Sequence, residues 1–262
     1  SLFFPTHAGD ISSACRTRLR LLTAAGYLHR AEVPHVRAEG RRPYVYMLTA
    51  AGCELLTAEL GLGPEELDWK PTYNNVSWPF LAHQLAINDA YIAFSLSVPR
   101  LGWRIERWVD DRLLRQQHVD RVFLTDEDGR EQEVAVVPDA YFVLTDGTAV
   151  LQFFLEIDRA TMTVASQSHR VKSWKQRIQA YQAYFSSDAI LQRYRTNRIR
   201  VLTVTTTAER LTNLKHATEA VGGRKRYWFA TMDDIRPEAV LARPVWQIAS
   251  ANGFHTLLQG SS

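Results

Sequence analysis

The spacing of apolar residues changes several times along this chain of 262 residues. Five segments have apolar positions at helical spacing, and we predict helices at residues 12–26, 49–60, 80–98, 163–185 and 208–221. Shorter apolar or alternating runs predict strands at residues 27–36, 44–48, 103–108, 136–141, 150–159, 199–205, 227–230 and 245–248. This order predicts an α/β protein of the α+β kind, with helices packed on a mixed sheet.

Two of these strands, residues 136–141 and 150–159, are expected to form a hairpin with a tight turn at Asp146-Gly147. The second strand is almost continuously apolar, as in a strand buried on both faces, and ends in Glu156-Ile157-Asp158. Alternation along a strand points Glu156 and Asp158 to the same face. If the hairpin pairs in register, Asp139 lies near them. Such a cluster of three carboxylates needs a divalent cation or basic side chains to compensate it.

The helix predicted at residues 163–185 supplies such basic side chains, among them Lys172 and Lys175. A basic helix after an acidic strand end can neutralise the carboxylates or hold a phosphate backbone. Alternatively, the acids are solvated strand ends or partners of Arg159 and Lys172. His83 lies on the helix predicted at residues 80–98. A single histidine on a helix is more often structural than catalytic.

The front of the chain has the order helix, glycine, hairpin, helix, which is that of a winged helix-turn-helix. In that module one helix enters the DNA major groove and the hairpin loop reaches the backbone or minor groove. No clear periodicity precedes Ser12, so we expect the first helix of the module to be short or missing.

Charge supports a DNA-binding role for this region, because residues 1–48 hold seven arginines against three acids. Guanidinium groups suit phosphate oxygens and guanine edges. The candidate DNA-binding residues are Arg16, Arg18, Arg20, Arg37, Arg41 and Arg42. The alternative is a winged domain that only contacts protein, with the arginines as a solvated face.

Turn-forming residues from 61 to 79 predict a linker, which gives a winged-helix domain at residues 1–62, a linker at 63–79 and an α/β domain at 80–262. A composition of 46% apolar and 23% charged residues is typical of globular proteins. The two cysteines do not suggest a disulfide framework, so we expect a cytoplasmic setting. No apolar run approaches the roughly 20 residues that span a bilayer, so no membrane partner is expected.

Known motifs for several enzyme classes are absent from the sequence. It has no glycine-rich dinucleotide motif, no P-loop, no zinc-ligand spacing and no nucleophile elbow. These absences argue against nucleotide-dependent dehydrogenases, P-loop NTPases, zinc proteins and α/β-hydrolases.

Three groups of segments carry a family resemblance: LRLLTAAGYL with PYVYMLTAAG, PDAYFVL with FFLEIDRATMT, and RYWFATMDDI with RPVWQI. From residue 14 to 248 the chain resembles the replication-relaxation family of bacterial plasmids, conjugative elements and phages. Its most specific part is E-I-D-R-x-T at Glu156–Thr161. Arg177 and Tyr181 fit a basic residue followed four positions later by tyrosine, although the family usually has lysine first. The resemblance implies a role in plasmid replication or in DNA relaxation during transfer.

The second domain also resembles the PD-(D/E)xK nuclease fold. Asp139 and Glu156 match its two metal-binding acids, while Asp158 stands where that fold has lysine. In this chemistry the carboxylates hold Mg²⁺ and the lysine helps to position the attacking water. Either Lys172 or Lys175 on the next helix replaces that lysine, or the domain has kept the fold and lost the reaction. On the first reading, Asp139, Glu156 and Asp158 are the metal ligands.

Three functions follow from these observations. The first is a non-enzymatic accessory protein that binds double-stranded DNA and a replication or relaxation partner protein. The second is a Mg²⁺-dependent nickase or endonuclease, and the third is a winged-helix transcription regulator. A homodimer is expected for any of them, because winged helices often bind two half-sites.

Overall fold

A computed structural model of the protein describes residues 13–32, 44–63, 66–67, 69–117, 119–125, 128–160 and 173–258. The chain divides into two compact units, residues 1–82 and 83–262. The residue limits given above for the two domains and their linker stay a prediction. No helix in the described ranges is long and apolar enough to cross a membrane.

The N-terminal unit contains two helices around a small antiparallel hairpin. Its elements are α1 (Ser13–Ala24), β1 (Leu28–Ala31), β2 (Val45–Leu48), α2 (Ala50–Leu60) and the short 3₁₀ helix η3 (Pro71–Asn74). This is the order that the apolar pattern predicts for residues 12–60, with a shorter first strand. The strands pair from Leu28 opposite Leu48 to Ala31 opposite Val45.

Local residue chemistry sets the ends of these helices. Gly26 follows α1 with a φ of 80°, a left-handed conformation that glycine adopts without a steric penalty. Thr49 caps α2, and its hydroxyl oxygen accepts a hydrogen bond from the Gly52 amide at 3.1 Å. Gly52 is also required for packing, because a Cβ there would lie 2.2 Å from the carbonyl oxygen of Tyr27. The backbones of α2 and of the residue just before β1 therefore approach each other closely.

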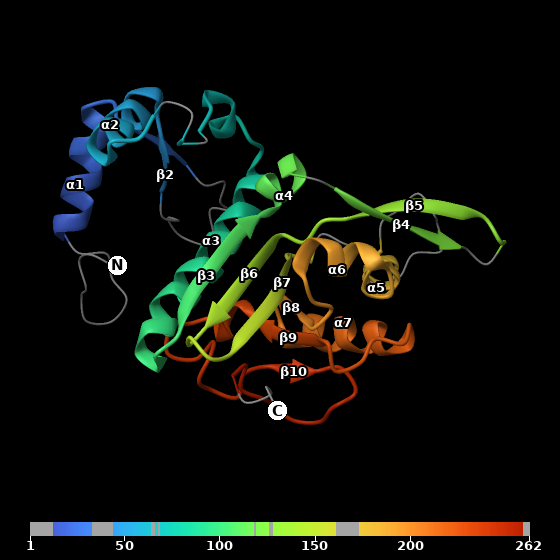
Figure 1. The fold of residues 1–262 in the computed structure, drawn as a ribbon. Helices are drawn as coiled ribbons and strands as arrows, with labels where there is room; N and C mark the ends of the chain where they lie inside the picture. Colours follow the sequence, from blue (N-terminus) through green and yellow to red (C-terminus); the bar gives the residue numbers. More distant parts are fainter. Residues whose placement is uncertain are drawn as a thin grey trace. The chain divides into compact units, whose positions relative to one another are not determined.

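The second unit is built on a six-stranded mixed sheet, which confirms the predicted fold class (Figure 1). The strand order is β10-β9-β8-β7-β6-β3. Its strands are β3 (Arg104–Asp110), β6 (Ala140–Thr145), β7 (Val150–Asp158), β8 (Ile199–Thr205), β9 (Tyr227–Thr231) and β10 (Gln247–Ile248). The pairs β7/β8 and β8/β9 are parallel, and the other three pairs are antiparallel.

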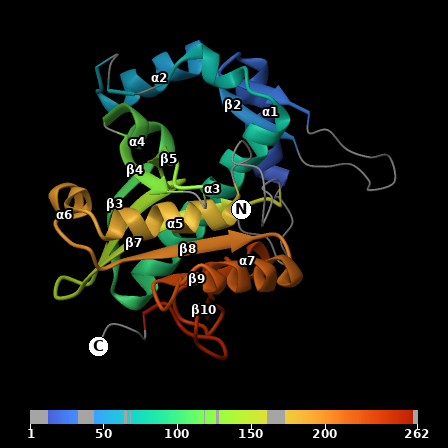
Figure 2. The same cartoon turned by 90° about the vertical axis from the view of Figure 1, so that its right-hand side faces the viewer.

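Helices cover both faces of this sheet. The helices of the unit are α3 (Trp78–Ser97), η4 (Val98–Leu101), α4 (Asp111–Gln117), α5 (Trp174–Phe185), α6 (Asp188–Tyr194), α7 (Ala208–Ala220) and η5 (Met232–Asp234). One apolar core lies between the sheet and α3, and the other lies between the sheet and α5, α6 and α7. Figure 2 shows α5 and α7 side by side on the same face.

The central strand β7 alternates between these two cores. Phe153, Leu155 and Ile157 belong to the core under α3, whereas Phe154 belongs to the core under α5 and α7. Because alternate residues share a face, Glu156 and Asp158 follow Phe154 toward α5 and α7. The hairpin β6/β7 with its turn at Asp146-Gly147 is confirmed.

The structure differs from the predicted elements in three places. Val136 ends a separate hairpin, β4 (Asp120–Thr125) with β5 (Glu131–Val136), and residues 137–139 turn the chain into β6. This ribbon packs on α5 at its base and projects from the main sheet (Figure 1). Helix α5 begins at Trp174, because Ser173 caps it by accepting a hydrogen bond from the Gln176 amide, and the predicted helical residues 163–172 lie outside the described residues. The short helices α4 and α6 were not predicted, because seven residues are too few for a periodic signal.

Candidate functional site

Asp139 lies in the turn before β6, at the end of the sheet where β7 finishes. Its Oδ2 accepts a hydrogen bond from the amide of Ile157 at 2.7 Å. Its Oδ1 lies 3.2 Å from Nε2 of His83 on α3. The predicted proximity of Asp139 to the acidic end of β7 is therefore observed, and a histidine is its basic partner.

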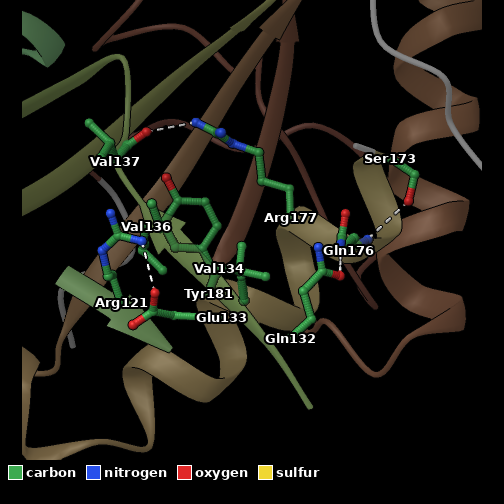
Figure 3. Close-up of a pocket in the computed structure, with 12 residues that line it drawn as sticks. Arg121, Gln132, Glu133, Val134, Val136, Val137, Ser173, Gln176, Arg177 and Tyr181 are labelled. Carbon is green, nitrogen blue, oxygen red and sulfur yellow. Dashed lines mark hydrogen bonds and ion pairs between the residues drawn. The ribbon is translucent and has the colours of Figure 1, made fainter. Parts of the chain in front are cut away.

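Glu156 is buried on β7 and faces α5. Nη2 of Arg177 lies 2.6 Å from one carboxylate oxygen and 2.7 Å from the other. The Tyr181 hydroxyl, one turn further along α5, donates a short hydrogen bond to the same carboxylate. Arg177 also donates to the carbonyl oxygen of Val137 at 2.9 Å (Figure 3). One arginine therefore ties the end of β7 to the turn that carries Asp139.

Asp158 is buried two residues further along β7 and faces α7. Its two oxygens accept hydrogen bonds from Nε and Nη2 of Arg210, at 2.9 and 3.0 Å. The hydroxyl of Thr205 on β8 donates to Oδ2 at 2.7 Å. A two-point guanidinium–carboxylate contact of this kind fixes both groups in one geometry. Through this contact the Asp158 side chain fixes α7 against the sheet.

Burial and these partners change the acid–base properties of the site. Burial raises the pKa of Glu156 to about 7, although the charge of Arg177 opposes that rise. The hydrogen bond to Asp139 raises the pKa of His83, against the opposing effect of burial. Burial also raises the pKa of Tyr181 well above its usual range. At neutral pH Glu156 therefore lies near its titration point, beside the permanent charge of Arg177.

The three carboxylates have separate basic partners in this arrangement. Each has its own basic partner, and these partners come from three different helices, α3, α5 and α7. Mg²⁺ requires several oxygen ligands that face one position. Within the described ranges, no group of three or more histidine, cysteine or acidic residues is arranged to hold a metal ion. As placed, the residues do not fit a Mg²⁺ site, and the metal-binding role of Asp139, Glu156 and Asp158 stays a prediction.

Of the two candidate lysines, only Lys175 lies in the described part of the chain. Lys172 lies outside the described residues. Lys175 is partly buried on α5, with no side-chain hydrogen bond or ion pair to any described residue. The residue on that helix that reaches Glu156 is Arg177. The catalytic roles predicted for these lysines stay untested.

Sequence reasoning left four site residues without a role: His83, Arg177, Tyr181 and Arg210. A usable signal existed for two of them, because Arg177 and Tyr181 are four residues apart and so share one face of α5. His83 and Arg210 come from distant segments, and only the tertiary fold brings them to Asp139 and Asp158.

The candidate DNA-binding residues are described only in part. Arg16, Arg18 and Arg20 lie on α1, are exposed, and have no side-chain hydrogen bond or ion pair with another described residue. Arg16 and Arg20 are one helical turn apart on the same face, and Arg18 points away from them. Arg37, Arg41 and Arg42 lie outside the described residues.

Comparison with known proteins gives one match. The family model described as Replication-relaxation matches residues 1–202, which include all of the N-terminal unit as well as Asp139, Glu156 and Asp158. No curated protein matches the chain significantly. No solved structure does so either.

Proposed function

The chain belongs to the replication-relaxation family, and on that premise we propose that it is a DNA-binding accessory protein for the replication or relaxation of plasmids or other mobile elements. In this proposal the N-terminal unit acts as a winged helix on double-stranded DNA in the cytoplasm. The second unit is a nuclease-like domain that has lost the reaction. It adds contacts to the duplex or recruits a replication or relaxation partner protein.

The observation that carries the proposal is the state of the arginines on α1. All three are exposed, and none has a carboxylate partner among the described residues. Exposed cations without partners are available to displace counterions from a phosphate backbone. The helix also stands directly before the β1/β2 hairpin, as a DNA-reading helix stands before the wing in a winged helix-turn-helix.

The charge balance of the second unit supports a non-enzymatic role for it. A nuclease of the PD-(D/E)xK type needs carboxylates that are available to a cation. Here Asp139, Glu156 and Asp158 are compensated by His83, Arg177 and Arg210. These contacts give the acids a structural task, which is to tie three helices to the end of the sheet.

The test is a salt titration of DNA binding. The fluorescence anisotropy of a labelled duplex is measured with the purified protein at several salt concentrations. We expect the logarithm of the association constant to fall linearly with the logarithm of the salt concentration. Each phosphate contact should contribute about −0.9 to the slope of that line. Asp139→Asn, which removes one charge from the second unit, serves as control and keeps the affinity. An affinity that is absent or independent of salt would refute the proposal.

A metal-dependent nickase is the second candidate. Its support is that Asp139 binds the amide of Ile157, so that the Asp139 and Glu156 carboxylates come from neighbouring points at one end of the sheet. Cleavage would then need a cation to displace Arg177 or His83 from the acids. Metal-dependent nicking of plasmid DNA separates the two candidates.

The proposal also includes a homodimer. A two-fold pair of winged helices would read two half-sites on one face of the duplex. Sedimentation velocity with and without duplex DNA measures this directly. A monomer in both conditions would remove the dimer from the proposal and leave DNA binding intact.

A further inference from the structure

A cavity of about 250 Å³ lies between the β4/β5 ribbon and the first two turns of α5. Figure 3 shows its walls. Gln132 and Gln176 stand on one side, Arg177 lies along α5 above Tyr181, and Val134 and Val136 contribute apolar surface. The cavity is next to the Glu156 site and shares Arg177 and Tyr181 with it, but none of the three carboxylates lines it.

Polar atoms without partners line this cavity. The amide nitrogen of Gln176 donates to the amide oxygen of Gln132 at 2.9 Å. This pair leaves the Gln132 amide nitrogen and the Gln176 amide oxygen without a partner among the described residues. The Nε atom of Arg177 is buried and has no hydrogen-bond partner in the described part of the chain. A buried N–H group without a partner is costly, so this donor indicates a missing acceptor.

The charges of the lining residues and the volume of the cavity restrict the kind of ligand that could supply this acceptor. Arg121 is paired with Glu133 at 3.0 Å and Arg177 with Glu156, so the lining offers no uncompensated charge to an ion. Its volume is below the range of about 300–1,000 Å³ that is usual for drug-sized ligands. The site therefore suits a small neutral molecule with an apolar face and with hydrogen-bond donors and acceptors on its edge.

We propose that this cavity binds a single nucleobase, with adenine favoured, presented by a DNA strand at an end, a gap or an unpaired position. Glutamine amides recognise adenine by accepting from N6 and donating to N7. Pockets for unstacked bases combine such edge contacts with apolar walls. The proposal rests on the DNA-binding function above and adds to it a site that distinguishes unpaired from paired DNA.

The test uses 8-vinyladenine, a fluorescent adenine analogue that keeps the N6 amino group and N7, at one position of a single-stranded oligonucleotide and as the free riboside. We expect the emission of the oligonucleotide to rise as the base leaves its neighbours, with saturation. Gln176→Leu removes an edge contact and Ala180→Phe fills the cavity, and each should weaken binding at least tenfold. Gln179→Leu is the matched control, because Gln179 is exposed on the same helix and does not line the cavity.

The outcomes separate this inference from the function on which it rests. Equal affinities for Gln176→Leu and Gln179→Leu, or no response with either ligand, would overturn the base site. A response to the riboside alone would assign a free nucleoside and would overturn the link to DNA. Duplex affinity is measured in parallel with all three variants. If it stays intact while the base site fails, the proposed function stands, and if the unmodified protein binds no duplex, the proposed function fails first.

Discussion

Three arginines of the second unit and the arginines of α1 have opposite surroundings. In the second unit, Arg177, Arg193 and Arg210 each reach a buried carboxylate, at nitrogen–oxygen distances of 2.6, 2.6 and 2.9 Å. In the N-terminal unit, the arginines of α1 are exposed and reach no acid among the described residues. An arginine that pairs with a buried carboxylate stabilises the fold. An exposed arginine without such a partner keeps its charge available to a ligand.

Burial follows the same division. The second unit has two apolar cores, one on each face of the sheet. Between residues 13 and 82, by contrast, the only buried described residues are Gly52 and Ala82. A substitution of a buried residue in the second unit should therefore act mainly on stability, whereas one on α1 should act mainly on binding.

The largest effect is expected at the Glu156–Arg177 pair. Glu156→Leu leaves the Arg177 charge and the Tyr181 hydroxyl without their acceptor. Breaking a buried pair on one side costs about 3–5 kcal/mol of unfolding free energy. Urea unfolding followed by circular dichroism measures this loss. Adding Arg177→Met to the same protein should restore part of the stability, and a double variant less stable than Glu156→Leu would show that the pair is not the cause.

The second effect concerns α1 and should appear in binding alone. Arg16→Ala with Arg20→Ala removes two charges from one face of the helix, and we expect an affinity for duplex DNA lower by roughly tenfold or more, with the salt slope reduced by about two. The unfolding free energy should change by no more than about 0.5 kcal/mol per substitution. Arg18→Ala, on the other face, is the matched control. Equal losses from Arg18→Ala and from the double variant would show that no single face of α1 meets the DNA.

The third effect is a pH dependence confined to the second unit. The pKa of Glu156 is raised from its ordinary value of 4.5 to about 7, so the folded protein holds this proton more tightly than the unfolded chain. Stability is therefore expected to fall as pH rises from about 4.5 to about 7, by on the order of 2 kcal/mol. In Glu156→Gln this fall should be smaller by the contribution of Glu156. Unfolding midpoints measured across this pH range test it, and an unchanged curve in the variant would assign the dependence elsewhere.

The smallest effect is expected at His83. Because Asp139 raises its pKa in the folded protein, its contribution is complete below the ordinary value of 6.5 and is lost as pH rises through the folded value. His83→Gln should cost about 1 kcal/mol at pH 6 and less at pH 9. Thermal unfolding at the two pH values measures this difference. A cost that is the same at both would mean that the histidine acts through packing alone.

The sequence was most informative where the hydrophobic pattern was strongest. Strand β8 has the predicted limits, and the β6/β7 hairpin has the predicted turn, because an apolar run bounded by Asp-Gly allows few alternatives. Residues 125–130 read as the tip of a hairpin, which the β4/β5 pair confirms, but the limits of its two strands and the late start of α5 were missed. Val136 and Asp139 read as one strand, and only pairing with β4 shows that Val136 belongs to another hairpin.

For the site, the sequence identified the acids but not their partners. Glu156 and Asp158 share a face, as period-two alternation requires, and Asp139 lies beside their strand. The compensation by three separate helices was not predictable, because His83 is 56 positions before Asp139 and Arg210 is 52 positions after Asp158. The sequence allows the negative charge of the carboxylates to be compensated either by a divalent cation or by basic side chains. Only the fold shows the basic partners.

The most direct test of the account is incubation of the purified protein with supercoiled plasmid in Mg²⁺, in Mn²⁺ and in EDTA, beside Glu156→Gln. Circular dichroism first establishes that the variant is folded. The account predicts intact plasmid in every lane and a salt-sensitive mobility shift with both proteins. Nicking that requires the metal and disappears in Glu156→Gln would contradict it, and would show that the carboxylates exchange their basic partners for a cation.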